Sequence, residues 1–242
     1  MKNKLKNKNI LITGASDGIG KQIAFTYGSN DANIIALGQS QSGLEDLDTL
    51  LSEYNAKTTL VPIDLKNYQL IHELEKKLCE KYNKLDAIIL NAATLGTLTP
   101  ITHIDESEWN DTFSVNLTSN IIILKVFEHF LKKSDAPQIF FMTSDIINDK
   151  KPFWGLYSAT KAALEKIAYS YAAEVRNLKI EVNLVDPGKV NTKLRLKAYP
   201  GENKLLLTQP EDLSAFFIDI IFNENISSSE LISYEKWKNE NT

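Results

Sequence analysis

The chain alternates short apolar, β-branched runs with longer stretches of helical period. The apolar runs are 9–13, 33–37, 58–63, 86–91, 138–143 and 180–185, with a further short run near 231–234. The stretches of helical period are 19–29, 43–53, 67–82, 106–132 and 157–177. The apolar runs show no clean polar alternation, so both faces of each strand are expected to be covered. This alternation predicts an α/β fold of the Rossmann type, a doubly wound parallel sheet flanked by helices in three layers.

The chain is predicted to form one domain over residues 1–242. No repeat, low-complexity linker or break in composition divides it, and an α/β domain of this size can stay undivided. Its 27 basic and 31 acidic residues give a net charge of −4, so we predict no nucleic-acid partner. The longest apolar runs, such as 215–222, are too short to cross a bilayer, so we predict no membrane partner either.

The cysteine and histidine content argues against disulfides and metals. A single cysteine, Cys79, excludes a disulfide within the chain and favours a reducing compartment. The lysine-rich first residues lead directly into a strand and a glycine loop, so we expect no signal peptide and a cytoplasmic location. His72, His103 and His129 show no metal-ligand spacing relative to one another or to Cys79. No metal site is therefore predicted.

The first predicted strand ends in a glycine-rich loop, TGASDGIG, at residues 13–20. Glycines here allow a tight strand-to-helix reversal and let a pyrophosphate approach the backbone. The free N–H groups and the dipole of the following helix favour an anion at this point. The spacing GxxxGxG differs from GxGxxG, and a plain turn is the alternative. The predicted cofactor contacts in the loop are Gly14, Ser16, Asp17, Gly18, Ile19 and Gly20.

The end of the second predicted strand bears on the choice of dinucleotide. An acidic residue there holds the ribose 2′-hydroxyl of NAD, whereas a basic residue accepts the 2′-phosphate of NADP. This chain has Gln39 and Ser40 at that place, and both side chains can donate hydrogen bonds to a phosphate. We therefore favour NADP(H) as cofactor and keep NAD(H) as the alternative, because Asp17 adds negative charge nearby.

Three polar residues follow the fifth predicted strand in the order Ser144, Tyr157 and Lys161. Tyr157 and Lys161 are four residues apart, so they share one face of a helix. A nearby cation favours a phenolate and is expected to lower the pKa of Tyr157, which suits the phenol to proton transfer near neutral pH. Ser144 follows a strand at its carboxyl end, where its hydroxyl would polarise a carbonyl oxygen. A Tyr–Lys pair at this spacing, taken alone, would more often be structural.

Taken together, these segments resemble the short-chain dehydrogenase/reductase family over residues 8 to 210. The resemblance rests on TGASDGIG, NAA at 91–93, Asn116, Ser144, YSATK at 157–161 and PGKVNT at 187–192. It implies a Rossmann fold, a nicotinamide cofactor and hydride transfer between that cofactor and a carbonyl or alcohol substrate. The sequence looks most like an uncharacterised bacterial reductase subgroup and more distantly like 3-oxoacyl-carrier-protein reductases.

The resemblance also implies roles for four catalytic residues. Tyr157 corresponds to the family's acid/base. Lys161 corresponds to the residue that lowers the tyrosine pKa and binds the nicotinamide ribose. Ser144 corresponds to the partner of the substrate carbonyl, and Asn116 to a residue that holds a water in a proton relay to Lys161.

Further cofactor contacts follow from the same resemblance. Asp64 corresponds to an aspartate near the adenine, Asn91 to an asparagine that supports the central sheet, and Thr192 to a hydroxyl that meets the nicotinamide carboxamide. The full set of contacts implied outside the glycine loop and the catalytic residues is Gln39, Ser40, Asp64, Leu65, Asn91, Ala92, Ala93, Pro187, Gly188, Val190 and Thr192.

The sequence departs from the family pattern in several places. Leu90 and Ala93 stand where the family usually has asparagine and glycine, Asp186 stands where asparagine usually precedes Pro-Gly, and Gln39 stands where members that bind NADP often have arginine. The C-terminal segment also differs, which bears on the family's tetramer. A homodimer or homotetramer is still expected, with a dimer formed through the helices at 106–132 and 157–177.

A lid and two alternative functions complete the predictions. A substrate lid is expected at about 190–210, where lysines and an arginine would attract an anionic substrate or form a solvated surface. Phe153 and Trp154 would line its mouth or pack the loop. The alternatives to a reductase are a nucleotide-binding regulator that keeps the fold without the chemistry, and an epimerase or lyase of the related longer branch.

Overall fold

The structure is a computed structural model that describes residues 4–54 and 56–241. Over these ranges seven strands form one sheet in the order β3-β2-β1-β4-β5-β6-β7, and every neighbouring pair is parallel. The strands are β1 Asn9–Thr13, β2 Asn33–Gly38, β3 Thr58–Pro62, β4 Ala87–Leu90, β5 Gln138–Met142, β6 Glu181–Asp186 and β7 Leu231–Ser233. The predicted parallel sheet is confirmed, including its short last strand.

The α-helices in the described part of the chain follow the strands in alternation. They are α1 Gly18–Gly28, α2 Gln41–Leu51, α3 Tyr68–Lys81, α4 Glu106–Phe113, α5 Ser119–Leu131, α6 Gly155–Glu174, α7 Lys193–Ala198, α8 Ser214–Ile220 and α9 Tyr234–Asn241. Short 3-10 helices are η1 Ile101–His103, η3 Asp145–Asn148, η4 Arg176–Leu178, η5 Lys204–Leu206 and η6 Pro210–Leu213, and a π-helical segment, η2, spans Ser114–Thr118.

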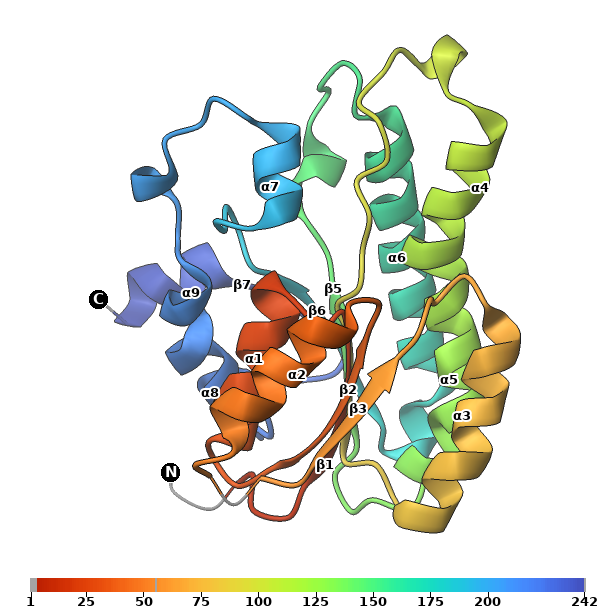
Figure 1. Cartoon of the computed structure of the whole chain (residues 1–242), viewed down its shortest axis with the longest axis vertical. Coiled ribbons are helices and arrows are strands. Elements are labelled where there is room, and N and C mark those ends of the chain that lie inside the picture. The colour runs from red at the N-terminus through yellow and green to blue at the C-terminus, as the bar shows by residue number, and fades with distance from the viewer. Residues whose placement is uncertain (1–3, 55, 242) are drawn as a thin grey trace.

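The helices cover both faces of the sheet, which gives the three predicted layers (Figure 1). Helices α1, α2, α8 and α9 pack on one face, and α3, α5 and α6 pack on the other. Helix α7 lies beyond the sheet, at the end where the strands terminate. The predicted Rossmann-type α/β architecture is therefore confirmed.

Successive strand residues pack into two separate apolar layers. Leu11, Ile35 and Ile88 belong to the layer beneath α3, α5 and α6, whereas Ile10 and Ile12 belong to the layer beneath α1, α2 and α8. All five side chains are fully buried. Because both faces of each strand are covered, no polar face is needed, and this explains why the sequence shows continuous apolar runs.

The strand order reverses at β1, and this reversal determines where the functional cleft lies. β1 pairs with β2 on one side and with β4 on the other. The chain leaves β1 into α1 on one face and leaves β4 toward α4 and α5 on the other face (Figure 1). Ligands of open α/β sheets bind in the crevice that such a reversal opens at the carboxyl ends of the strands.

Two parts of the helix prediction differ from the structure. The stretch 106–132 is not one helix, because the π-helical segment Ser114–Thr118 separates α4 from α5. Helices α7, α8 and α9 were not predicted, since each has eight residues or fewer and lacks a long helical period. In the described ranges, no helix combines the length and the apolar content that a bilayer crossing requires.

Candidate active site

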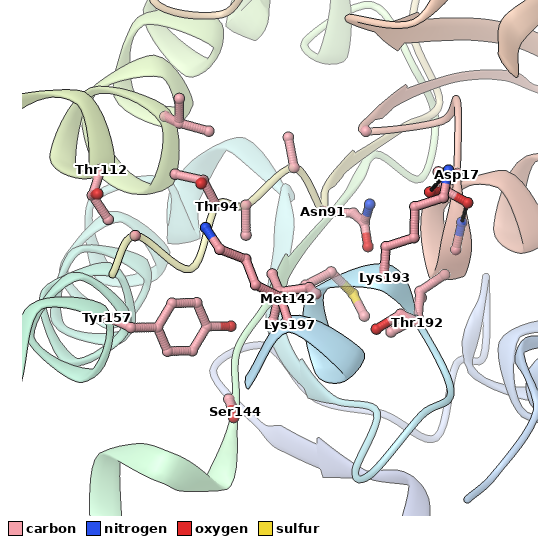
Figure 2. A pocket seen from close by; sticks show the side chains of 18 of the residues that line it. Asp17, Asn91, Thr94, Thr112, Met142, Ser144, Tyr157, Thr192, Lys193 and Lys197 are labelled. Carbon is pink, nitrogen blue, oxygen red and sulfur yellow. Dashed lines mark hydrogen bonds and ion pairs between the residues drawn. The ribbon is translucent and has the colours of Figure 1, made fainter. Parts of the chain in front are cut away.

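A cleft runs along the carboxyl ends of the strands, and Figure 2 shows some of the side chains that line it. Its walls come from the loops that follow β1 to β6, together with α6 and α7. The predicted site residues that line it are Gly14, Ser16, Asp17, Gly18, Ile19, Gln39, Asp64, Leu65, Asn91, Ala92, Ala93, Ser144, Tyr157, Lys161, Pro187, Gly188, Val190 and Thr192. The predicted residues outside this lining are Gly20, Ser40 and Asn116.

The glycines of the glycine loop stand where close packing or the backbone conformation disfavours a side chain. Gly14 has a φ of +69°, in the left-handed region that favours glycine. A Cβ atom added to Gly20 would collide with the carbonyl oxygen of Gly14 and with the amide nitrogen of Asn91. Asp17 caps α1 by accepting a hydrogen bond from the Gly18 N–H at 2.8 Å. Gly20 thus packs directly against Gly14 on the side of the loop away from the cleft lining. The glycines expose backbone N–H groups to the cleft, as a pyrophosphate-binding turn requires.

Thr13, the last residue of β1, joins the glycine loop to the end of β4. Its buried hydroxyl accepts hydrogen bonds from the N–H groups of Asn91 at 2.9 Å and Ala92 at 3.0 Å. Asn91 Nδ2 donates in return to the Thr13 carbonyl at 3.0 Å. These bonds position both sides of the cleft floor. The sequence analysis missed Thr13, although a polar residue at the end of an apolar strand was the signal.

A smaller hollow adjoins the cleft where β2 meets α2. Ser40 caps α2 by accepting a hydrogen bond from the Gly43 N–H at 3.1 Å, and its hydroxyl lies 3.2 Å from that of Ser42. Lys21 on α1 lines the same hollow, with its Nζ 3.6 Å from an oxygen of Asp46. Lys21 and Ser42 were not predicted as site residues. Ser42 is two residues from Ser40 in the sequence, whereas Lys21 reaches the hollow only because α1 packs beside α2.

Tyr157 and Lys161 lie on α6 and are almost fully buried, with exposed fractions of 7% and 3%. Figure 2 shows the Tyr157 ring reaching into the cleft. Lys161 Nζ donates a hydrogen bond to the carbonyl oxygen of Met142, at the end of β5, at 2.8 Å. The same nitrogen lies 5.8 Å from the centre of the Tyr157 ring. The predicted phenol and ammonium therefore meet at the cleft, with the ammonium fixed to the sheet.

The protonation of this pair differs from the prediction. Burial raises the pKa of the Tyr157 phenol above its ordinary value, and the negative charges of Asp186 and Asp145 raise it further. Burial also lowers the pKa of Lys161 to about 8. The predicted lowering of the tyrosine pKa is not found, because desolvation penalises the phenolate and the two nearby carboxylates repel it.

Ser144 follows β5 and lines the cleft beside Tyr157 (Figure 2). Its hydroxyl caps the short helix η3 by accepting a hydrogen bond from the Ile146 N–H at 3.4 Å, and it donates to Asp145 Oδ1 at 3.4 Å. Both contacts are long, so the hydroxyl remains available to a ligand oxygen.

Asn116 is fully buried in the π-helical segment and lies outside the lining of the cleft. Its Oδ1 accepts from the Thr94 N–H at 2.8 Å, and its Nδ2 donates to the Thr94 carbonyl at 2.9 Å and to Thr160 Oγ1 at 3.0 Å. Both amide protons are engaged, so this side chain ties the loop after β4 to α6. The Asn116 side chain therefore has no amide proton left for the predicted relay water, and other polar atoms nearby would have to hold it.

The loop after β6 leads from the sheet to the lid. Asp186 Oδ1 accepts a hydrogen bond from the Gly188 N–H at 3.0 Å, and burial raises the pKa of the Asp186 carboxyl. Thr192 caps α7 by accepting from the Arg195 N–H at 3.2 Å. Lys193 Nζ then pairs with Asp17 Oδ2 of the glycine loop at 2.8 Å, so α7 and the glycine loop are joined across the cleft (Figure 2).

Ion pairs and aromatic contacts occupy much of the predicted basic lid. Arg195 donates to both oxygens of Glu202, at 2.7 and 2.6 Å. The Tyr199 ring lies 5.5 Å from that of Trp154, which also packs edge-on against Tyr157. Trp154 is therefore part of the wall of the site. Paired charges in the lid weaken the case for an anionic substrate.

These features define an α/β protein with a dinucleotide-type cleft at the strand reversal and a buried tyrosine–lysine pair beside it. The sequence matches the short chain dehydrogenase family over residues 8–203, which is most of the 242-residue chain. The protein therefore belongs to the short chain dehydrogenase family and is an oxidoreductase of that family. The resemblance inferred from the motifs is confirmed.

Two relatives show the range of proteins that the sequence resembles. YciK, an uncharacterized oxidoreductase of Escherichia coli, is 29% identical over 220 residues, covering 88% of this chain and 86% of YciK. IRC24 of Saccharomyces cerevisiae, a benzil reductase that forms (S)-benzoin, is 32% identical over 201 residues, covering 78% of this chain and 73% of IRC24.

Solved structures agree with the fold over almost the whole chain. A short chain dehydrogenase of Shigella flexneri complexed with NADP superposes with a TM-score of 0.90 at 26% identity, covering 97% of this chain and 100% of that chain. A short chain dehydrogenase of Escherichia coli complexed with NADPH has a TM-score of 0.89 at 27% identity, covering 96% and 98% of the two chains.

Proposed function

We propose that this protein is an NADP(H)-dependent reductase of small carbonyl compounds, with Tyr157 as the proton donor. The observation that carries the proposal is the burial of Tyr157 and Lys161 beside a cleft that the glycine loop also lines. Bound NADPH would supply a hydride to the carbonyl carbon. The chain itself binds the dinucleotide, orients the carbonyl and delivers the proton.

The residues of the cleft fit a dinucleotide. Gly14, Gly18 and Gly20 keep part of the turn free of side chains, and the backbone N–H groups of the turn suit a pyrophosphate. The hydroxyls of Ser40 and Ser42 and the ammonium of Lys21 surround the neighbouring hollow. Together they would hold a ribose 2′-phosphate, which supports NADP(H) over NAD(H). The NADP and NADPH bound by two solved relatives support the same choice.

Tyr157 is prepared to act as an acid. Because burial, Asp186 and Asp145 raise its pKa, the phenol keeps its proton at neutral pH. A carbonyl oxygen that gains negative charge in the reaction would take this proton. Ser144 lines the same cleft and would donate a hydrogen bond to the same oxygen. A protonated phenol fits the role of proton donor in carbonyl reduction.

Lys161 and the neighbouring buried amides support the resupply of the proton. The pKa of Lys161, lowered by burial to about 8, lets the ammonium exchange a proton close to neutral pH. Asn120 Nδ2 donates to the Asn116 carbonyl at 2.8 Å, while Asn120 Oδ1 is a buried acceptor with no partner among the described residues. An ordered water would satisfy that acceptor. We therefore place the proton relay at the Asn116–Asn120 turn rather than at the Asn116 side chain.

One wall of the cleft is apolar, although Arg195 and Lys197 also line the cleft. Trp154 and Tyr157 belong to a small buried cluster, against which Leu194 and Tyr199 of the predicted lid region, about 190–210, also pack. This wall suits an uncharged, hydrophobic ketone or aldehyde. The benzil reductase among the relatives makes benzil a suitable first probe.

The proposal is tested by replacing Tyr157 with phenylalanine. We expect Tyr157→Phe to lower turnover of benzil or another carbonyl with NADPH by ~10²- to 10⁴-fold, the range for loss of a general acid. NADPH affinity, measured by calorimetry, should change little. Tyr54→Phe is the control, because Tyr54 is exposed and lies outside the lining of the cleft and outside α4, α5 and α6. Turnover by Tyr157→Phe at the level of Tyr54→Phe would refute the assignment.

The same assay separates the alternative functions. A nucleotide-binding regulator would bind NADPH without oxidising it in the presence of any of a panel of carbonyl compounds. An epimerase or lyase would convert its substrate without net cofactor turnover. The buried tyrosine–lysine pair supports the reductase over the regulator.

We also propose that the protein forms a homodimer through α4, α5 and α6, with a homotetramer as the alternative. Each of these helices exposes a large apolar or aromatic side chain: Trp109, Ile121 and Tyr169 have exposed fractions of 41%, 40% and 37%. Light scattering would test this, and a monomer at micromolar concentration would contradict it.

A further inference from the structure

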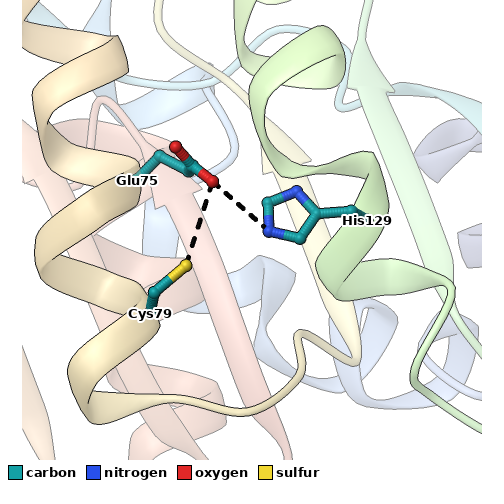
Figure 3. A group of neighbouring side chains, drawn as sticks. All are labelled: Glu75, Cys79 and His129. Carbon is teal, nitrogen blue, oxygen red and sulfur yellow. Dashed lines mark hydrogen bonds and ion pairs between the residues drawn. The ribbon is translucent and has the colours of Figure 1, made fainter.

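Three side chains capable of binding metals meet on the outer surface, between α3 and α5. Glu75 and Cys79 are four residues apart on α3, and His129 lies on α5 (Figure 3). His129 Nε2 is 3.4 Å from Glu75 Oε1, and Cys79 Sγ is 3.8 Å from the same oxygen. All three ligand atoms lie within 4.8 Å of one another. The sequence analysis missed this cluster because His129 is fifty residues away along the chain.

The donor set and its spacing suit zinc. A thiolate, an imidazole and a carboxylate are the three ligand types that Zn²⁺ takes from proteins, and tetrahedral zinc places them about 3.3 to 3.7 Å apart. Two of the three separations are already close to these values, and the third closes with small side-chain rotations. Hard cations such as Mg²⁺ and Ca²⁺ prefer sets made only of oxygen, so the thiol and the imidazole argue against them.

Without a metal, the same contacts stabilise little. The Glu75–His129 pair is exposed, with side-chain exposed fractions of 32% and 43%, and such pairs contribute little to stability. The exposed Cys79 thiol, which forms no disulfide, makes only a long contact with Glu75. His129 Nε2 and Cys79 Sγ nevertheless both approach the same oxygen of Glu75. In this arrangement a single cation could bind all three atoms in place of the protons between them.

We propose that Glu75, Cys79 and His129 bind one Zn²⁺ ion, with water as the fourth ligand. The site lies outside the lining of the cleft, so it is independent of the proposed reductase activity. Zinc binding displaces the thiol proton of Cys79, and a neutral His129 would ligate through Nε2 and carry its proton on Nδ1. The ion would join α3 to α5, two helices that cover the same face of the sheet.

The test uses the full-length protein, stripped with a chelator and kept reduced with a phosphine rather than a thiol. Zn²⁺ alone is titrated by calorimetry and by competition with a chromophoric chelator. We expect one ion per chain. Cys79→Ser, His129→Gln and Glu75→Gln should each weaken binding by at least the ~10- to 100-fold that even loss of an outer-shell partner costs. Co²⁺ should give a thiolate charge-transfer band that Cys79→Ser abolishes.

His103→Gln is the matched control, because His103 is an exposed histidine on η1, outside the cluster. It should bind zinc as the wild type does. The variants change surface or half-exposed side chains, and circular dichroism without metal confirms their fold. Absence of zinc binding up to about 100 μM, or equal affinity in wild type and all three cluster variants, would overturn the proposal. Carbonyl reduction is measured separately on the zinc-free protein. Failure of the zinc proposal and failure of the proposed reductase function can therefore be told apart.

Discussion

The floor and the roof of the cleft are built in opposite ways. The floor consists of the glycine loop at residues 13–20 and the buried side of α6, where Tyr157 and Lys161 are almost inaccessible. The roof is the segment 193–208, where Leu205 and Leu206 are 89% and 83% exposed. A Cβ on Gly20 in the floor would collide with backbone, whereas one on Gly201 in the roof would meet nothing within 4 Å.

The two regions are also held by different forces. Close packing and buried hydrogen bonds fix the floor, such as those from Thr13 and from Lys161. The roof is attached mainly through ion pairs and ring contacts, including Lys193 with Asp17 and Tyr199 with Trp154. Packing tolerates little change, and exposed ion pairs stabilise weakly. The floor should therefore control chemistry and stability, and the roof should adjust to the ligand.

Among the variants that compare the floor with the roof, replacement of Lys161 should have the largest effect. Lys161→Met should reduce turnover by ~10²-fold or more, because it removes a participant in proton transfer. It should also change the pH dependence of stability. Burial lowers the pKa of Lys161 from 10.5 to about 8, so between these values the unfolded chain binds more protons than the folded chain. The free energy of unfolding should therefore rise with pH across this window in wild type.

The difference between wild type and Lys161→Met isolates this group, and urea unfolding at pH 7.5 to 10 measures it. The wild-type protein should gain stability relative to the variant as the pH rises. A constant difference would contradict the burial of a charged ammonium in the floor.

A methyl group in the glycine loop comes next. Gly20→Ala should destabilise the protein by ~1–3 kcal/mol through overpacking, since the new Cβ meets Gly14 and Asn91. NADPH binding should weaken at the same time, because the loop must move to make room. Thermal unfolding and calorimetry with NADPH measure the two effects. Unchanged stability would show that the floor is more adaptable than its contacts imply.

The ion pair between roof and floor should matter less. Lys193→Ala and Asp17→Asn each break a contact between exposed groups, so KM for NADPH should change less than ~5-fold. The change should shrink at high salt. A loss of turnover as large as that from Lys161→Met would show that the roof takes part in the chemistry.

The smallest effect is expected in the roof itself. Gly201→Ala places a methyl group in open space, so its effect on stability should stay within ~0.5 kcal/mol, as for other surface substitutions. Unfolding measured beside Gly20→Ala tests the contrast directly. Similar losses in both variants would remove the distinction between floor and roof.

The floor was largely predictable, and the roof was not. The apolar runs, the glycine loop and the four-residue spacing of Tyr157 and Lys161 are local patterns, and local patterns determine strands, turns and helix faces. The roof contains only short helices, such as Lys193–Ala198, which have no periodic signal. Its shape depends on contacts with Asp17 and Trp154, which are distant in the sequence.

The amino-acid sequence alone determined the α/β class, the position of the glycine loop and the shared helix face of Tyr157 and Lys161, because these depend on short-range spacing and on strand order. The other residues that line the cleft were predicted only through the family resemblance. Only the tertiary structure decided how the site is charged. The upward shift of the Tyr157 pKa comes from burial and from Asp186 and Asp145, and the proximity of His129 to Glu75 and Cys79 depends on how α5 packs against α3. Desolvation and proximity arise only when the chain packs, so residue spacing along the sequence cannot predict the pKa shift of Tyr157 or the cluster at His129.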